Sequence, residues 1–325
     1  MPSREEIAYF GAGPAPLPTA VVEAGARAFV NYNDIGLGLG EISHRSPTAN
    51  KILEKTKADL STVLDIPEDY EILFLQAGGS GEFSAVVQNL VSVWIERRRR
   101  RAEADILKTS PSIEKEQLDE LVLWRLQKEV DQELKLDYLV TGSWSLKASQ
   151  EAARLVGGKH VNISLDARKS NDGKFGKIPP EDSWSLTPTK RDGGKGSAFV
   201  YFCDNETVDG VEFQSFPQSL EAQGGDEEDE RLVVADMSSN FLSRKVDVRK
   251  YAVIFVSRSG SFCWMYADDR SIVRLNIGWS AKEHRSYRDH NCHYTKISST
   301  AANCHPAGVT PSQIEYWRPS GADSV

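Results

Sequence analysis

A glycine-rich turn is the first place in this sequence where residue types and spacing suggest chemistry. Gly78-Gly-Ser-Gly81 follows an apolar segment, residues 71–76, and precedes apolar residues at helical spacing from Glu82 onward. A buried strand, a tight turn and a helix N-terminus in this order present backbone N–H groups and the positive end of a helix dipole to an anion. The anion that we expect there is a phosphate, although an ordinary strand-to-helix turn has the same pattern.

A tryptophan and an aspartate follow two other apolar segments. Trp144 comes shortly after residues 137–141, and Asp236 directly follows residues 232–235. A phosphate-binding turn, an aromatic ring and a carboxylate that keeps a ring nitrogen protonated are three of the four parts of a pyridoxal phosphate site. The fourth part is a lysine that forms a Schiff base with the cofactor. Trp144 alone could be a core residue and Asp236 alone could cap a turn, but their joint placement favours the cofactor site.

The elements that would position these residues alternate between strand and helix patterns. Helical spacing predicts helices at 19–32, 48–64 and 146–155, and short apolar runs predict strands at 71–76, 137–141, 160–165, 198–203, 232–235 and 251–255. This alternation predicts an α/β fold with a mainly parallel sheet and helices on both faces. Ligands of such sheets bind beyond the C-terminal strand ends, where the glycine turn, Trp144 and Asp236 all fall.

Two further helical segments, about residues 96–136, interrupt this alternation and predict a helical insertion at the surface. The insertion begins with the basic run Glu96-Arg-Arg-Arg-Arg-Arg101. Such a run can bind nucleic acid or act in targeting, but acidic residues from Glu103 to Glu133 follow it closely and the formal charge of the chain is −8. We therefore expect an exposed helix and no nucleic-acid partner.

The composition is that of a folded globular protein, with 325 residues of which 40% are hydrophobic and 9% aromatic. No apolar run is long enough to span a bilayer and no charged-then-apolar leader follows Met1, so we expect a soluble, cytoplasmic protein without a membrane partner. Three of the four cysteines lie after Phe255, together with four of the six histidines. Cys292-His293 and Cys304-His305 could bind zinc, but their spacing is not typical of zinc sites, and we expect no metal.

A glycine-rich loop, residues 36–46, holds His44 and Arg45 between the first two predicted helices. Loops carry both idle and functional polar residues. The pair is therefore compatible with plain solvent exposure or with a role in a site.

Six short motifs stand in order along residues 9–255. They are Phe10-Gly-Ala-Gly-Pro-Ala15, Glu41-Ile-Ser-His-Arg45, Gly78-Gly-Ser-Gly-Glu-Phe83, Asp137-Tyr-Leu-Val-Thr-Gly-Ser-Trp144, Asn205-Glu-Thr-Val-Asp-Gly210 and Ala235-Asp-Met-Ser-Ser239. This ordered set resembles the phosphoserine aminotransferase family of the class-V aminotransferases. The resemblance implies the large domain of the fold-type I pyridoxal phosphate enzymes. It also implies a homodimer that transfers an amino group between glutamate and 3-phosphohydroxypyruvate, a phosphorylated 2-oxo acid, in L-serine biosynthesis.

The same resemblance implies roles for individual residues toward the cofactor. Gly79 and Ser80 would bind its phosphate, and Trp144 would stack on its ring. Thr207 would hydrogen-bond near the ring hydroxyl, and Asp236 would pair with the ring nitrogen.

Two other residues would face the substrate. His44 would lie beside it, and Arg45 would hold its carboxylate with a two-pronged guanidinium contact. The chain departs from the family pattern at Gly11, where many members have serine, and at Ser80, where many have arginine.

The family pattern stops after Phe255. There the family continues with Ala-Gly-Ala-Gln-Lys-Asn-Ile-Gly-Pro, whose lysine carries the cofactor, but this chain reads Val256-Ser-Arg-Ser-Gly-Ser-Phe-Cys-Trp-Met265. No lysine is in register, so we predict a chain that is inactive as written. Residues 1–255 are expected to form the large domain, and residues 256–325 an aberrant, disordered or loosely packed tail in place of the small C-terminal domain. The alternative function is a catalytically dead protein that binds phosphate or pyridoxal phosphate and pairs with an intact subunit.

Synonymous codons offer an explanation of this tail. Val256-Ser257 can be encoded GTA AGT, the usual start of an intron. The codons for residues 277–286 can be chosen so that a shift of one nucleotide gives TAG, an intron end, followed by Ala-Gly-Ala-Gln-Lys-Asn-Ile-Gly. The hypothesis is that residues 256 to about 277 translate an intron and that the remainder is a frameshifted exon.

Overall fold

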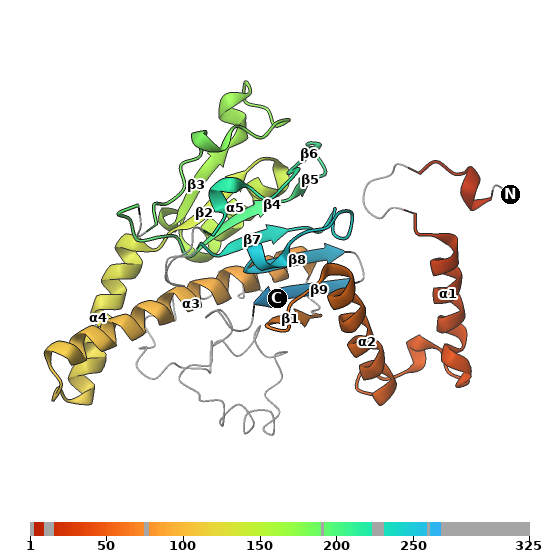
Figure 1. The fold of residues 1–325 in the computed structure, drawn as a ribbon, viewed down its shortest axis with the longest axis horizontal. Coiled ribbons are helices and arrows are strands. Elements are labelled where there is room, and N and C mark those ends of the chain that lie inside the picture. Colours follow the sequence, from red (N-terminus) through yellow and green to blue (C-terminus); the bar gives the residue numbers. More distant parts are fainter. Residues whose placement is uncertain are drawn as a thin grey trace, which may run out of the picture.

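A seven-stranded sheet forms the centre of the structure (Figure 1). The computed structural model describes residues 3–9, 16–74, 78–189, 192–222, 231–258 and 261–267. The strands lie in the order β1 (Tyr70–Leu73), β9 (Ser261–Ala267), β8 (Val253–Arg258), β7 (Val233–Asp236), β4 (Phe199–Cys203), β2 (Leu136–Val140) and β3 (Val161–Asp166). Neighbours from β8 to β3 pair in parallel, and β9 runs antiparallel to both β8 and β1. The predicted α/β fold with a mainly parallel sheet is confirmed.

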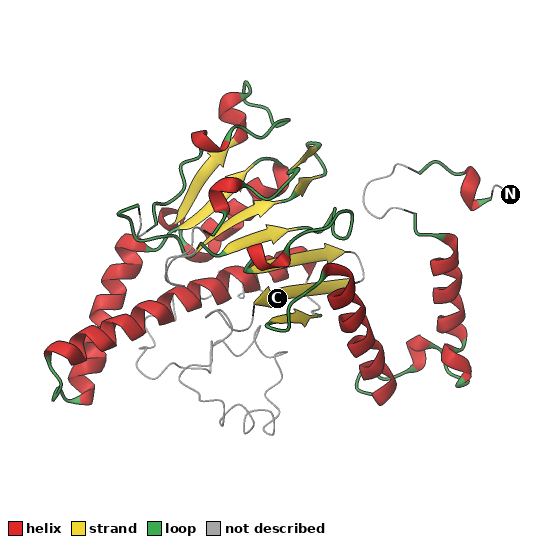
Figure 2. Ribbon diagram, viewed as in Figure 1, coloured by secondary structure: helices red, strands yellow, loops and turns green. Residues whose placement is uncertain are grey.

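Long helices cover one face of this sheet. α3 (Gly78–Thr109) and α5 (Ser143–Val156) pack there, and Val87, Leu90 and Ala152 on these helices are at most 1% exposed. Figure 2 shows α3 running along the sheet and on beyond its edge. The other face is covered by the end of α2 (Pro47–Leu64) and by loops that contain short 3₁₀ helices.

Burial on both faces explains the uninterrupted apolar strands. Every residue of β4 is at most 4% exposed, because alternate side chains enter the two opposite core clusters. The rings of Tyr138 and Tyr201 lie 5.2 Å apart on the α3 side, and Phe83 of α3 meets Tyr201 edge-on at 5.5 Å. Burying an aromatic side chain of this size contributes roughly 2 kcal/mol.

The predicted insertion is a helical hairpin. α4 (Lys115–Glu133) packs against the C-terminal half of α3 through Ala102, Leu118 and Val122, and the pair extends away from the sheet (Figure 1). The insertion ends earlier than predicted, because Leu136 already begins β2. The short loop of residues 134–135 therefore joins the hairpin directly to the sheet.

Arginines of the basic run bind acidic side chains. Arg98 donates to Glu133 at 2.9 Å and to the carbonyl oxygen of Lys195 at 3.0 Å, and its guanidinium lies 4.7 Å from the centre of the Trp94 ring. Arg99 and Arg100 both donate to Glu96 at 2.7 Å. The run is helical as expected, but it is not wholly exposed, because Arg98 is buried between the two helices of the hairpin and only Arg100 of the run is exposed.

The sheet does not end at Phe255 as predicted. β8 continues to Arg258, and Val256 is only 3% exposed. The backbone of β9 fills the place between β8 and β1, with Val253 opposite Tyr266 and Tyr70 opposite Ala267. The first part of the expected tail is therefore built into the sheet, whereas residues 268–325 lie outside the described residues.

α1 (Thr19–Val30) stands apart from the sheet (Figure 1) and buries none of its residues. Its apolar side chains Val21, Phe29 and Val30 are 55%, 70% and 78% exposed. None of the helices in the described ranges is both long and apolar enough to cross a membrane.

Two arginines of the basic run should differ in their contribution to stability. Arg98→Ala should lower the free energy of unfolding by about 2–3 kcal/mol, because its side chain is 8% exposed and its removal leaves Glu133 without its donor. Arg100→Ala is the matched control and should cost about 0.5 kcal/mol, since that side chain is 51% exposed. Urea denaturation of both variants measures the difference, and equal losses would contradict it.

Candidate functional site

The C-terminal ends of three neighbouring strands meet at one edge of the sheet. Cys203, the last residue of β4, lies opposite Asp236, the last residue of β7, and Asp236 lies opposite Phe255 in β8. Figure 1 shows these strands pointing to the same side. Parallel pairing thus brings together residues that are 33 and 19 positions apart in the sequence, as expected for a ligand site of this fold class.

Asp236 sits in a network of hydroxyl and amide donors at this edge. Its Oδ1 accepts from the backbone N–H of Ser238 at 2.9 Å and from the Ser238 hydroxyl at 2.6 Å, and the Tyr201 hydroxyl also donates to the carboxylate. The Ser238 Oγ in turn accepts from the backbone N–H of Ser257 at 2.8 Å. Burial outweighs these bonds and raises the pKa of Asp236 above that of an ordinary aspartate. A neighbouring cation would therefore stabilise its charged form.

The glycine turn reaches this network through Ser257. A Cβ atom on Gly79 would lie 3.3 Å from the Ser257 Oγ, so the helix start and the end of β8 are in close contact. α3 begins at Gly78, whose φ of +63° favours glycine, and not at Glu82 as predicted. Within the described ranges, the backbone N–H groups of Gly79 and Ser80 have no hydrogen-bond acceptor. They can donate to an anion at the positive end of a 32-residue helix.

Trp144 and Thr207 bind each other beside the start of α5. The indole Nε1 donates to the Thr207 Oγ1 at 3.1 Å, and the Lys147 ammonium lies 4.5 Å from the ring centre. The Trp144 side chain remains 44% exposed. The loop that carries Thr207 is tied to the Asp236 side of the edge, because Asn205 donates to the Ser239 Oγ at 2.9 Å. The structure therefore joins Trp144, Thr207 and Asp236 through hydrogen-bonded neighbours.

Two carboxylates that the sequence did not single out hold the same helix start. Glu206 accepts from the backbone N–H groups of Trp144 and Ser145, both at 2.8 Å, and Asp209 accepts from that of Ser143 at 2.6 Å. Both acids belong to one of the six motifs. The sequence held one indication of these contacts. The first turn of α5 carries no acidic residue of its own, so a carboxylate that faces its positive end has to come from another segment.

His44 and Arg45 lie apart from this network. Both are exposed on the loop before α2. Within the part of the chain that the structure describes, the only hydrogen bond made by either residue runs from the Arg45 backbone N–H to the Ser43 Oγ at 3.3 Å. Ser46 caps α2 by accepting from the Ala49 backbone N–H at 3.1 Å. The structure does not bring His44 and Arg45 together with Asp236 or Trp144.

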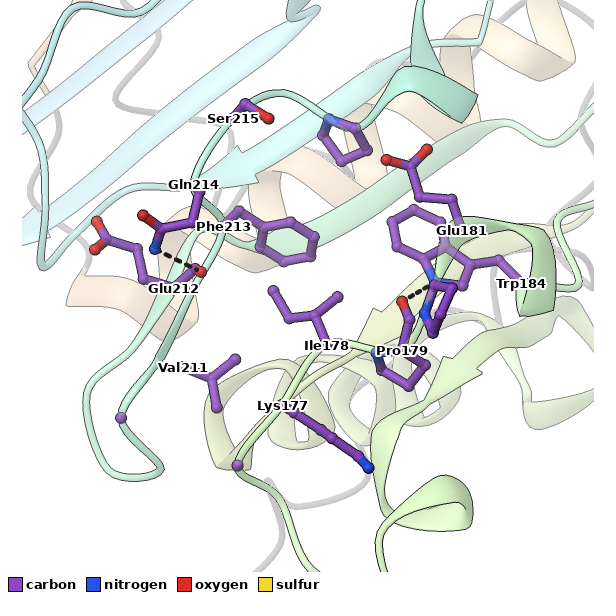
Figure 3. A pocket seen from close by; sticks show the side chains of 14 residues that line it. Lys177, Ile178, Pro179, Glu181, Trp184, Val211, Glu212, Phe213, Gln214 and Ser215 are labelled. Atoms are coloured by element: carbon purple, nitrogen blue, oxygen red, sulfur yellow. Dashed lines mark hydrogen bonds between the residues drawn. The ribbon is translucent and has the colours of Figure 1, made fainter.

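A separate cavity of about 450 Å³ lies on the other side of the Asn205–Glu206 and Val211–Glu212 hairpin (Figure 3). Residues 176–181 and 210–215 form most of its lining, and Figure 3 shows Ile178, Phe213 and Trp184 directed toward one another. None of the expected site residues lines it. The described residues contain no cluster of three or more His, Cys, Asp or Glu side chains that could hold a metal, and Cys292 and Cys304 lie outside them.

An aromatic ring, a half-buried carboxylate and a helix start whose first N–H groups have no acceptor among the described residues, all at the C-terminal edge of a mainly parallel sheet, are typical of a pyridoxal phosphate site. The aminotransferase class-V family model matches residues 7–103. Solved structures of phosphoserine aminotransferases have the same fold, so the class of protein that this chain resembles is the class-V aminotransferase family.

Within this family the chain is similar to phosphoserine aminotransferases. It is 40% identical to that of Saccharomyces cerevisiae over 286 residues, which are 86% of this chain and 61% of the relative. It is 36% identical to that of Drosophila melanogaster over 249 residues, which are 77% of this chain and 52% of the relative. The PLP-bound phosphoserine aminotransferase of Trichomonas vaginalis matches with a TM-score of 0.58 and 26% identity, over 88% of this chain and 65% of that one. The chain thus spans little more than half the length of the curated relatives it matches.

The raised pKa of Asp236 predicts how stability depends on pH. The stability contributed by this group is fully present below about pH 4, where an unfolded aspartate titrates, and is lost as the pH rises through the folded-state pKa. Asp236→Asn has no proton to lose, so its stability relative to the wild type should increase between pH 4 and pH 7.

The control is Asp247→Asn. The Arg249 guanidinium donates to Asp247 and lowers its pKa, so its stabilising effect is present above the ordinary aspartate pKa and is lost at lower pH. This variant should therefore lose stability relative to the wild type as the pH rises. Urea denaturation at several pH values measures both, and parallel curves for Asp236→Asn and the wild type would contradict the prediction.

Proposed function

We propose that this edge of the sheet binds pyridoxal phosphate and that the chain is derived from a phosphoserine aminotransferase. The observation that carries the proposal is that hydrogen bonds connect the surroundings of Trp144 and Asp236, and that the start of α3 lies in close contact with the same network at Ser257. The similarity to phosphoserine aminotransferases supports glutamate and 3-phosphohydroxypyruvate as the substrates of the intact enzyme.

Each residue of the edge has contacts suited to one part of the cofactor. The N–H groups of Gly79 and Ser80 would donate to the phosphate, and the half-exposed Trp144 would stack on the ring. Thr207 already accepts from the indole, so its hydroxyl proton is available for the oxygen of the ring hydroxyl. Asp236 would hold the ring nitrogen protonated. In that state the bound cofactor supplies an electron sink for the α-carbon of an amino acid.

The proposed site lacks its lysine. Counting from Phe255, Gly260 stands where the family motif has the residue that carries the cofactor. Without an amine at this position the chain can bind and orient a cofactor but has no base for moving a proton at the substrate α-carbon. We therefore propose that the chain is inactive as written. Turnover of glutamate by the purified chain would refute this.

The second candidate is a catalytically dead binding protein that pairs with an intact subunit. The presence of Trp144, Asp236 and the α3 start without the lysine favours it, since binding and chemistry use different residues. An abundant, stable protein with this tail in cells would support it. Its absence, together with spliced transcripts that restore the lysine, would support a defective gene product.

The origin of the tail is a separate proposal. The intron hypothesis predicts genomic DNA in which GT follows the Phe255 codon and AG precedes the shifted motif. Against it, the match to the yeast protein runs over 286 residues, more than the 255 that precede Val256, so similarity continues past that point. Genomic and transcript sequences across codons 256–286 decide between an intron and a divergent but genuine coding segment.

We also propose a homodimer that forms through the N-terminal segment. Exposed apolar side chains gathered on one helix are typical of interaction surfaces, and Val21, Phe29 and Val30 of α1 are of this kind. His44 and Arg45 lie on the same exposed segment, away from the site of their own chain. The family that the chain resembles has sites near its subunit boundary, so this pair would serve the partner's site.

Cofactor binding tests the proposed site without requiring the lysine. Pyridoxamine 5′-phosphate should bind the full chain, and Trp144→Ala should weaken binding about tenfold through loss of the stacking face. Asp236→Ala should weaken it about a hundredfold through loss of the charged hydrogen bond to the ring nitrogen. Titration calorimetry measures both. The control is Trp124→Ala, which removes a 63% exposed ring on α4 and should change nothing. Unchanged affinity in the Trp144 and Asp236 variants would reject the site.

Association should depend on α1. Phe29→Asp combined with Val30→Asp should convert the dimer to a monomer in light scattering at micromolar concentration, because two charges would have to enter an apolar contact. Trp124→Asp on the distant hairpin serves as the control and should leave the dimer intact. A wild-type monomer, or a dimer that tolerates both aspartates, would show the proposed interface to be wrong.

A further inference from the structure

The first turn of α5 is held by an unusual pair of caps. A helix start leaves backbone N–H groups without partners, and a side chain just before the helix normally accepts from them. Here that position is Gly142, which has no side chain, and the acceptors come from the loop 205–209. Glu206 binds the N–H groups of Trp144 and Ser145, and Asp209 binds that of Ser143. Hydrogen bonds to an ionised carboxylate are stronger than those to a neutral acceptor.

This arrangement requires both the glycine and a buried charge. Glu206 is 0% exposed, and a Cβ atom on Gly142 would lie 2.5 Å from its Cγ and Cδ atoms. The φ of Gly142 is −165°, which any residue can adopt, so the glycine is needed for space and not for backbone shape. A serine at position 142 could cap the helix without burying a carboxylate. Capping alone therefore does not account for Glu206.

The contact of Glu206 with the start of α5 also affects the indole ring of Trp144. Glu206 fixes the backbone N–H of Trp144, and the adjacent Thr207 fixes its side-chain Nε1. The ring is 44% exposed and is not confined by core packing, so its orientation depends on these two contacts and on Lys147. The same loop is tied to the Asp236 side of the edge through Asn205 and Ser239.

We propose that Glu206 and Asp209 are positioning residues that act through Trp144 and hold its indole in the orientation that stacks on the cofactor. The inference rests on the proposed function for its cofactor, but the orientation of the ring can be measured without one. Glu206 also prevents a phosphate from binding at α5, because its carboxylate occupies the helix start. The start of α3, whose first N–H groups have no acceptor among the described residues, is thereby left as the phosphate-binding end.

The experiment uses the full chain and measures pyridoxamine 5′-phosphate affinity by calorimetry. Glu206→Gln keeps the shape and one acceptor oxygen and should weaken binding about tenfold, close to the effect of Trp144→Ala. In the Trp144→Ala background the same substitution should have less than a twofold further effect, since no ring remains to be positioned. Glu151→Gln on the same helix breaks only a surface pair with Arg154 and should leave affinity unchanged.

Fluorine NMR of the chain labelled with 5-fluorotryptophan gives a readout that needs no cofactor. The Trp144 signal is assigned by its loss in Trp144→Phe. Glu206→Gln and Asp209→Asn should shift or broaden this signal and leave the signals of the other six tryptophans in place, while Glu151→Gln should change none.

The outcomes separate this inference from the proposed function. If the wild type does not bind pyridoxamine 5′-phosphate, the proposed function fails, and the fluorine signal alone decides whether Glu206 orients the ring. If the wild type binds and the Glu206→Gln variant binds equally well, the positioning role is wrong. It is also wrong if the Glu206→Gln substitution weakens binding by the same factor in the wild type and in the Trp144→Ala background. A Glu206→Gln spectrum in which all tryptophan signals move shows a general structural role and also overturns the inference.

Discussion

The register of the parallel strands is the constraint on which the site depends. β4 and β7 end opposite each other at Cys203 and Asp236, and the backbone bonds continue one step further, from Asp204 N–H to the Asp236 carbonyl at 2.9 Å and from Met237 N–H to the Phe255 carbonyl at 3.0 Å. The loops after these strands are therefore fixed at their first residue. A shift by one residue would turn each terminal side chain to the opposite face and separate the cluster.

Three carboxylates lie at this edge, namely the buried Asp204 and Glu206 and the half-buried Asp236, and loss of solvent raises the pKa of each. They differ in what compensates their charge. Asp204 binds the Arg244 guanidinium at 2.6 Å, and Glu206 faces the positive end of α5. Among the described residues, the donors to Asp236 are all neutral, namely two hydroxyls and one backbone N–H. It is therefore the carboxylate of the three with the most to gain from a protonated ring nitrogen.

Much of this arrangement follows from local sequence pattern. Apolar runs predicted β2, β4 and β7 to within a residue or two, because strands buried on both faces need an uninterrupted apolar sequence. Placing Trp144 and Asp236 at strand ends was enough to bring them to one edge. The hydrogen bonds from the start of α5 to Glu206 were not predictable in the same way. They join residues that are 61 and 62 positions apart, and they depend on the space left at Gly142. The distance of His44 and Arg45 from this edge was also not predictable, because a loop motif does not show where in space its side chains lie.

β9 shows why sequence interpretation and structure diverged after Phe255. A strand between β8 and β1 is held by main-chain N–H and C=O groups of both neighbouring strands. Because these hydrogen bonds use the backbone alone, a segment of suitable length without proline can form them whatever its side chains. Residues 261–267 meet that requirement, whatever their coding origin. Their presence in the sheet is therefore compatible with an aberrant tail as well as with a genuine one. What a backbone ladder cannot provide is a specific side chain before it, and in the sequence Gly260 stands where the motif of the family that this chain resembles has its lysine.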